Sequence, residues 1–136
     1  MKLIKEPELD KNIKITSAED VYNYLEEFKD EDREYFIVIG LNNKNKILYR
    51  EITNIGTIKE NIIDPRTIFK NAIMKSVVKI IIAHNHPSGD IEPSKEDRRT
   101  TERLKEAGEI LEIKILDHII IGTEGYYSIE GEENEI

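Results

Sequence analysis

One apolar run explains much of the rest of this chain: it reads VVKIIIA at residues 77–83 and continues as HNHP at residues 84–87. The run is short, nearly continuous and rich in β-branched side chains, which is typical of a strand buried on both faces. Residues i and i+2 of a strand point to the same side, so His84 and His86 should face one point if extended backbone lasts to His86. Pro87 then ends the strand, because it has no N–H for the ladder.

A serine and an acid follow the histidines. After the loop at residues 88–93, Ser94 and Asp97 open a predicted helix that can turn back over the strand end. Two imidazoles and one carboxylate match a zinc site with an open position, and the absence of cysteine excludes thiolate sites. A structural alternative exists, since His-x-His is a weak motif and Ser-x-x-Asp is close to a capping box. The two interpretations are compatible, because a first-turn carboxylate can cap the helix and still face a cation.

The first third of the chain predicts an arm, a helix and a hairpin. Residues 1–15 are expected to form an extended arm that covers an edge or a partner. Residues 16–20 are typical of a helix start, and the apolar residues that follow are spaced as one helix face: Val21, Tyr24, Leu25 and Phe28. Residues 34–41 and 46–53 predict the two strands of a hairpin.

The remaining pattern alternates helices and strands. Asp64 and Pro65 predict the start of a helix with the apolar face Ile68, Phe69, Ala72 and Ile73. Residues 95–107 predict a charged surface helix that Gly108 ends. Further strands are expected at residues 111–116, 118–122 and 126–129. This order predicts an α/β fold with a mixed sheet.

Composition limits the class of protein. The 136 residues carry 20 basic and 28 acidic side chains, for a net charge of −8. That length predicts one domain, and the acidity disfavours binding to a phosphate backbone, which needs clustered Lys and Arg. No N-terminal apolar segment is typical of a signal peptide, and no run reaches the ~20 residues that span a bilayer. The expected location is therefore the cytoplasm.

The spacing His84-x-His86-x7-Ser94-x2-Asp97 resembles the JAMM signature of the MPN+/JAB metalloproteases. Longer stretches resemble the bacterial RadC family: HNHPSGD at 84–90, PSKED at 93–97, LDHIIIG at 116–122, DREYF at 32–36, GT at 56–57 and DPR at 64–66. The resemblance implies a curved mixed sheet flanked by helices, the JAB/MPN or cytidine-deaminase-like architecture. We expect this domain at residues 33–129, after an N-terminal arm and helix at 1–32 and before an acidic tail at 130–136.

The resemblance also implies roles for individual residues. His84, His86 and Asp97 would bind zinc, and Ser94 would donate a hydrogen bond to the developing oxyanion. The general base of JAMM proteins is a glutamate on an early strand, which corresponds to Glu34; Glu51 on the neighbouring strand is the competitor.

Four further residues lie near these motifs. His118 is interpreted as a buried, hydrogen-bonded histidine near the site, because apolar residues follow it. Asn85 should point away from the ligands and orient the loop, and Ser88 and Asp90 could contact substrate or simply be solvated.

Three functions are compatible with this sequence. The first is a zinc metallohydrolase that cleaves an amide bond of a protein or peptide substrate. The second is a DNA-repair accessory of RadC type; the charge of −8 and the lack of a helix-hairpin-helix pattern in residues 1–32 make nucleic acid the weaker expectation. The third is a protein-binding MPN module without turnover, which intact ligands argue against. The N-terminal arm and the edge strands leave room for a homodimer.

Overall fold

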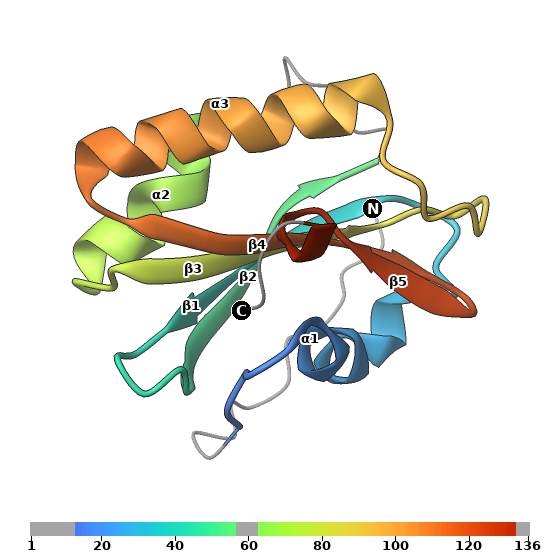
Figure 1. Cartoon of the computed structure of the whole chain (residues 1–136), viewed down its shortest axis with the longest axis horizontal. Coiled ribbons are helices and arrows are strands. Elements are labelled where there is room, and N and C mark those ends of the chain that lie inside the picture. Colours follow the sequence, from blue (N-terminus) through green and yellow to red (C-terminus); the bar gives the residue numbers. More distant parts are fainter. Residues whose placement is uncertain (1–12, 57–62, 133–136) are drawn as a thin grey trace.

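The computed structural model describes residues 13–56 and 63–132, and within them one five-stranded mixed sheet forms the centre (Figure 1). Its order is β2-β1-β3-β4-β5. The strands are β1 (Tyr35–Leu41), β2 (Ile47–Ile55), β3 (Lys79–Asn85), β4 (Lys114–Gly122) and β5 (Gly125–Ser128). Only β3 and β4 pair in parallel among these five, and β1 and β2 form the expected hairpin. The predicted α/β fold with a mixed sheet is confirmed.

Helices cover both faces of the sheet. Helix α1 (Ala18–Tyr24) and the 3-10 turn η1 (Glu26–Phe28) lie on one face, and α2 (Pro65–Met74) and α3 (Lys95–Leu111) lie on the other (Figure 1). Each layer has its own apolar core. The α1-side core includes Val21, Leu25 and Phe28 from the predicted helix face, and the α2/α3-side core includes Ile68 and Phe69. None of the helices in the described ranges is long and apolar enough to cross a bilayer.

Strand β3 divides its side chains between the two cores. Ile81 and Ala83 pack in the α1-side core, whereas Ile80 and Ile82 pack in the α2/α3-side core. The prediction of a strand buried on both faces is confirmed, although β3 begins two residues later than residue 77 and Val78 is exposed. His84 continues the row of Ile80 and Ile82, so it emerges on the side that α3 covers.

Two expectations about the helices are wrong. Ile73 does not belong to the buried face of α2, since its side chain is 57% exposed near the helix end. Gly108 does not end α3, which continues to Leu111 and stops where Glu112 takes a left-handed conformation (φ 57°). Gly108 is buried inside the helix, where there is no room for a side chain: a Cβ would lie 2.4 Å from the Ile113 carbonyl oxygen.

The two strands expected at residues 111–116 and 118–122 are one strand, β4. A β-bulge lies where the break was expected: Ile80 pairs with Ile115 and Ile82 pairs with His118, so two residues of β4 oppose one of β3. Asp117 lies in this bulge and is fully buried. Its carboxylate is satisfied there by hydrogen bonds from the backbone N–H groups of His118 and Glu130 and from the Ser128 hydroxyl.

The chain ends extend the sheet only in part. Residues 13–15 of the predicted arm pair with the segment at the start of β2, through a bridge between Lys14 and Lys46. Residues 1–12 of the arm lie outside the described residues. Of the predicted acidic tail, Glu130–Glu132 form the 3-10 turn η2, and residues 133–136 lie outside the described residues.

Candidate metal centre

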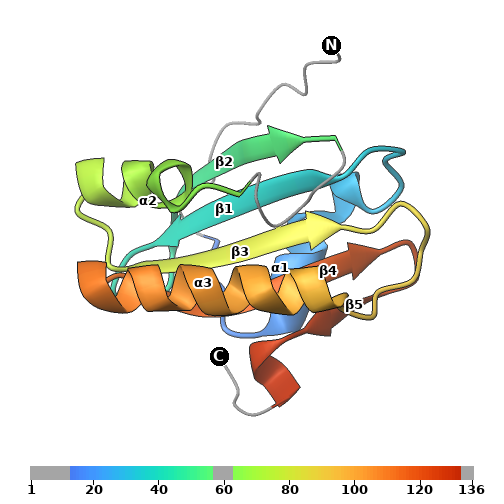
Figure 2. The same ribbon diagram turned by 90° about the horizontal axis from the view of Figure 1, so that it is seen from above.

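Two imidazoles and one carboxylate converge where β3 ends and α3 begins. The Nε2 atoms of His84 and His86 are 2.9 Å apart. His84 Nε2 lies 3.3 Å from Asp97 Oδ1, and His86 Nε2 lies 3.2 Å from Asp97 Oδ2. Figure 2 shows why these segments meet: the first turn of α3 lies at the same end of the sheet as the last residues of β3. The structure therefore brings together the three side chains singled out as metal ligands.

The start of α3 is held by the predicted capping box. Ser94 Oγ accepts a hydrogen bond from the Asp97 backbone N–H (3.0 Å), and Asp97 Oδ2 accepts one from the Ser94 backbone N–H (2.9 Å). The same Oδ2 faces His86, while Oδ1 faces His84. The capping interpretation and the ligand geometry thus coexist in one side chain, and the cap fixes where the carboxylate points.

The charges in the cluster are strongly coupled. Burial alone would raise the pKa of Asp97, but hydrogen bonds with the His84 and His86 rings hold that pKa well below its ordinary range. Burial opposes a charged His86 ring, yet its contact with Asp97 raises its pKa above the ordinary value. Asp97 is therefore an ionised carboxylate at neutral pH, which is the form that binds a cation.

The donor set fits zinc. One atom each from His84, His86 and Asp97 lie within 4.8 Å of one another, and two imidazole nitrogens with one carboxylate are a known catalytic ligand set. His86 Nδ1 lies 2.7 Å from the carbonyl oxygen of Asp90, which can only accept. The ring hydrogen of a neutral His86 therefore sits on Nδ1, and the Nε2 lone pair faces the cluster.

A second layer of side chains stands behind His84. His118 is fully buried, with its Nε2 2.8 Å from His84 Nδ1 and its Nδ1 2.6 Å from Thr101 Oγ1. Phe36 stacks on His84 at 5.9 Å and meets His118 edge-on at 5.7 Å. The interpretation of His118 as a buried, hydrogen-bonded histidine near the site is confirmed. Thr101 was missed, although its place one turn after Asp97 on the same helix was a usable signal.

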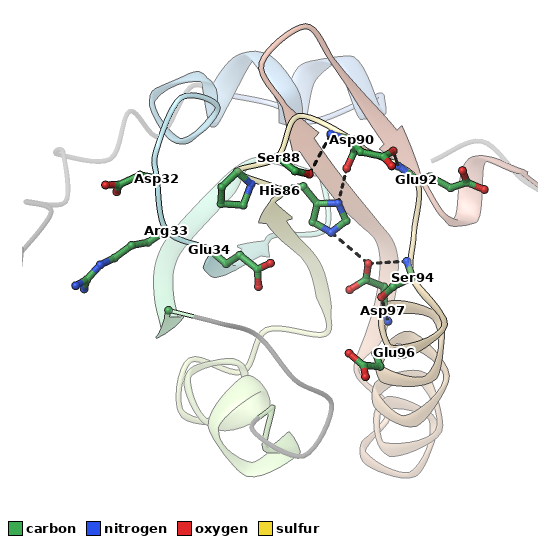
Figure 3. A pocket seen from close by; sticks show the side chains of 12 residues that line it. Asp32, Arg33, Glu34, His86, Ser88, Asp90, Glu92, Ser94, Glu96 and Asp97 are labelled. Atoms are coloured by element: carbon green, nitrogen blue, oxygen red, sulfur yellow. Dashed lines mark hydrogen bonds and ion pairs between the residues drawn. The ribbon is translucent and has the colours of Figure 1, made fainter.

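The two candidate bases lie in different places. Glu34 lines the same cavity as His86 and Asp97, and its carboxylate points toward them (Figure 3). Glu51 instead forms a hydrogen bond with the Asn71 side chain of α2 and is absent from the described lining of this cavity. The fold therefore brings Glu34, and not Glu51, to the metal cluster.

Asn85 holds the backbone on both sides of Glu34. Its side-chain oxygen accepts from the Tyr35 N–H and its amide donates to the Arg33 carbonyl oxygen, both at 2.7 Å. As expected, Asn85 points away from the ligands: it lies on the α1 side of β3, as Ile81 and Ala83 do. It orients the start of β1, however, and not the loop that follows it.

The cluster opens into a cavity of about 920 Å³. Ser94 and both loop residues expected near substrate, Ser88 and Asp90, contribute to its wall (Figure 3). Half of the twelve described lining residues are acidic: Asp32, Glu34, Asp90, Glu92, Glu96 and Asp97. Arg33 is the basic residue of the lining, and its side chain points away from the cavity in Figure 3.

Comparison with known proteins agrees with this arrangement. A family model described as a RadC-like JAB domain matches residues 15–135. The chain belongs to this RadC-like JAB domain family. It is 50% identical over 123 residues to a UPF0758 protein of Staphylococcus haemolyticus, a match covering 90% of this chain and 54% of the relative. It is 49% identical over 128 residues to a UPF0758 protein of Caldanaerobacter subterraneus subsp. tengcongensis (88% and 55%).

The match with these relatives covers only part of their length. A UPF0758 protein of Methanosarcina mazei is 46% identical over 120 residues, covering 88% of this chain and 52% of the relative. The chain thus spans about half the length of the relatives it matches. The RadC-like JAB domain is the part that they share with it.

Proposed function

We propose that this RadC-like JAB domain is a zinc-dependent metallohydrolase that cleaves an amide bond in a protein or peptide. The observation that carries the proposal is that His84, His86 and Asp97 converge beside a cavity that His86, Asp97 and Glu34 line together. A purely structural cluster would not need a carboxylate in the cavity beside it. When bound, zinc supplies Lewis-acid chemistry that polarises a carbonyl and makes water acidic near neutral pH.

Glu34 has the position of a general base. It lies close enough to the cluster for its negative charge to raise the pKa of His86. Its carboxylate would accept a proton from the attacking water and later donate it to the leaving amine, a role typically worth about 10²–10⁴ in rate. Asn85 supports this role by fixing the backbone before and after Glu34.

Ser94 has a hydroxyl hydrogen available for the developing oxyanion. Its oxygen already accepts from the Asp97 N–H, so the cap uses a lone pair and leaves the hydrogen free to be donated. Because the cap also restrains the side chain, the donor is held in place before substrate arrives, which is the condition for effective oxyanion stabilisation.

The acidic lining supports a peptide over a nucleic acid as the occupant of the cavity. The cavity beside the cluster is lined by Asp32, Asp90, Glu92 and Glu96, with Arg33 as the one arginine of the described lining. Phosphate groups would meet repulsion from these carboxylates, whereas an amide backbone carries no net charge. The net charge of −8 acts in the same direction over the whole chain.

The decisive test compares two glutamate substitutions that remove one negative charge each. We expect Glu34→Gln to keep its zinc, measured by metal mass spectrometry, and to lose about 10²–10⁴ in turnover of fluorescence-quenched peptides. The matched control Glu51→Gln should keep both, since Glu51 contacts Asn71 and not the cluster. His84→Ala and Asp97→Ala should lose the metal. A Glu34→Gln protein with wild-type turnover would show that Glu34 is not the base.

A further inference from the structure

His84, His118 and Thr101 form a continuous chain of hydrogen bonds that ends on another ligand residue. The links are His84 Nδ1 to His118 Nε2 (2.8 Å), His118 Nδ1 to Thr101 Oγ1 (2.6 Å), and Thr101 Oγ1 to the Asp97 carbonyl oxygen (2.9 Å). We propose that His118 and Thr101 are positioning residues that hold His84 in the tautomer whose Nε2 lone pair faces the metal. This assignment rests on the zinc site proposed above.

The direction of the chain follows from its two ends. A His84 ring that binds metal through Nε2 must carry its hydrogen on Nδ1, and that hydrogen can only be donated to His118 Nε2. His118 then accepts at Nε2, so its own hydrogen lies on Nδ1 and is donated to Thr101 Oγ1. The Thr101 hydroxyl donates to the Asp97 carbonyl oxygen, which carries no hydrogen. Every link is satisfied in this direction.

Burial makes the chain costly to interrupt. His84, His118 and Thr101 are each at most 1% exposed, so solvent does not replace a lost partner. A neutral imidazole has one donor and one acceptor, which is what the contacts of His118 with His84 and Thr101 require. Phe36 covers the two rings from the side and restrains their planes.

The bulge in β4 explains how His118 reaches this place. Ile115 packs in the α2/α3-side core, and strict alternation would put residues 117 and 119 on that side as well. Ile119 instead packs in the α1-side core. The extra residue of the bulge reverses the alternation and turns His118 toward α3, where Thr101 lies.

Removal of the Thr101 hydroxyl should act on the metal at a distance. In Thr101→Val the Nδ1 hydrogen of His118 loses its acceptor, and the ring then favours a hydrogen on Nε2. That hydrogen points at His84 Nδ1 and moves the His84 hydrogen to Nε2, the atom that faces the metal. His86 is unaffected, because the Asp90 carbonyl fixes its tautomer separately. The expected result is a weaker site and not its abolition.

The experiment measures zinc affinity of the full chain by competition with a chromogenic chelator. We expect Thr101→Val to weaken the zinc Kd about 10–100-fold, the usual effect of losing an outer-shell partner. Thr101→Ser keeps the hydroxyl and should restore the affinity to near the wild-type value. Thr100→Val is the matched control, because Thr100 is the adjacent buried threonine and stands outside the chain of hydrogen bonds.

A second measurement needs no substitution. Long-range ¹H–¹⁵N spectra of the zinc-loaded wild type should place the ring hydrogens of both His84 and His118 on Nδ1. A ring hydrogen on Nε2 of His118 would overturn the assignment, as would a Thr101→Val affinity equal to that of Thr100→Val. A wild type that binds no zinc would overturn the proposed function as well, whereas a zinc-binding wild type with an unaffected Thr101→Val would overturn this assignment alone.

Discussion

At the scale of one residue, the Asp97 carboxylate caps α3 and also belongs to the group that could hold a metal ion. One carboxylate oxygen accepts from the Ser94 N–H and faces His86, and the other faces His84. The capping box predicted from Ser-x-x-Asp therefore prepares the ligand, because it fixes the rotamer before any cation arrives. Asn85 holds the backbone on both sides of Glu34 through hydrogen bonds with Tyr35 and Arg33.

Tyr49 allows a test of the energetics of one buried group. Its hydroxyl is buried and contacts no hydrogen-bond partner among the described residues. An unsatisfied buried polar group costs about 1–3 kcal/mol, so Tyr49→Phe should leave the free energy of unfolding unchanged or raise it by about 1 kcal/mol. Urea titration followed by circular dichroism would measure this.

Tyr22→Phe is the matched control for that substitution. The Tyr22 hydroxyl donates to the Gly122 carbonyl oxygen at 3.0 Å, so its removal should lower the free energy of unfolding by about 1 kcal/mol.

Burial also raises the pKa of Tyr49. The folded state then retains a proton that the unfolded chain releases near pH 10, so stability falls above that pH, and less so in Tyr49→Phe. An equal loss of stability above pH 10 in the wild type and in Tyr49→Phe would contradict this explanation.

At the scale of elements, the ligands depend on how α3 packs along the sheet. Gly108 lies within α3, and a side chain there would collide with the carbonyl oxygen of Ile113, just before β4 begins. The sequence pattern suggested a helix end there, since glycine is common just after a helix. The residue that actually takes the left-handed conformation is Glu112.

Two substitutions near the end of α3 test these backbone constraints. Gly108→Ala should destabilise the protein by about 1–2 kcal/mol, because the clash outweighs the better helix propensity of alanine. Glu112→Gly should gain up to about 1 kcal/mol, since glycine takes a positive φ without strain. Thermal unfolding of both variants would measure the two shifts. A stabilised Gly108→Ala protein would show that the close approach does not constrain the helix.

At the scale of the whole molecule, a metal would connect segments that only the tertiary fold brings together. His84 and His86 lie at the end of a central strand, and Asp97 opens the helix that covers it. A cation held by all three favours the folded chain over the unfolded chain, which has no formed site.

Zinc should therefore raise the stability of the whole chain. At a free zinc concentration of 100 times Kd, we expect about 2.7 kcal/mol of stabilisation, visible as a higher Tm by scanning calorimetry and reversed by a chelator. Asp97→Asn is the control, because it keeps a similar shape while it removes the ligand charge, and its Tm should barely respond. The same rise in both proteins would mean that zinc binds elsewhere.

Patterns within short stretches of the sequence were sufficient to predict several elements of this protein. The β-branched run before His84 indicated a doubly buried strand, and its period of two placed both histidines on one side. The N-caps at Ser94 and Asp64 were also visible, because capping depends on residues within one turn. The spacing of the two histidines, Ser94 and Asp97 indicated the candidate metal site in another way, through its resemblance to the JAMM signature, because these residues belong to different elements.

Only the tertiary structure decided the features that depend on distant neighbours. Which of the two glutamates lies beside the candidate metal site depended on the contact of Glu51 with α2 and on the cavity that Glu34 lines. The interior place of Gly108 needed its approach to Ile113. The bulge that turns His118 toward Thr101 follows from the pairing of β4 with β3 and from a buried Asp117 satisfied by Ser128 and Glu130. Hydrogen-bond satisfaction and close packing act between elements, whereas periodicity and capping act within one.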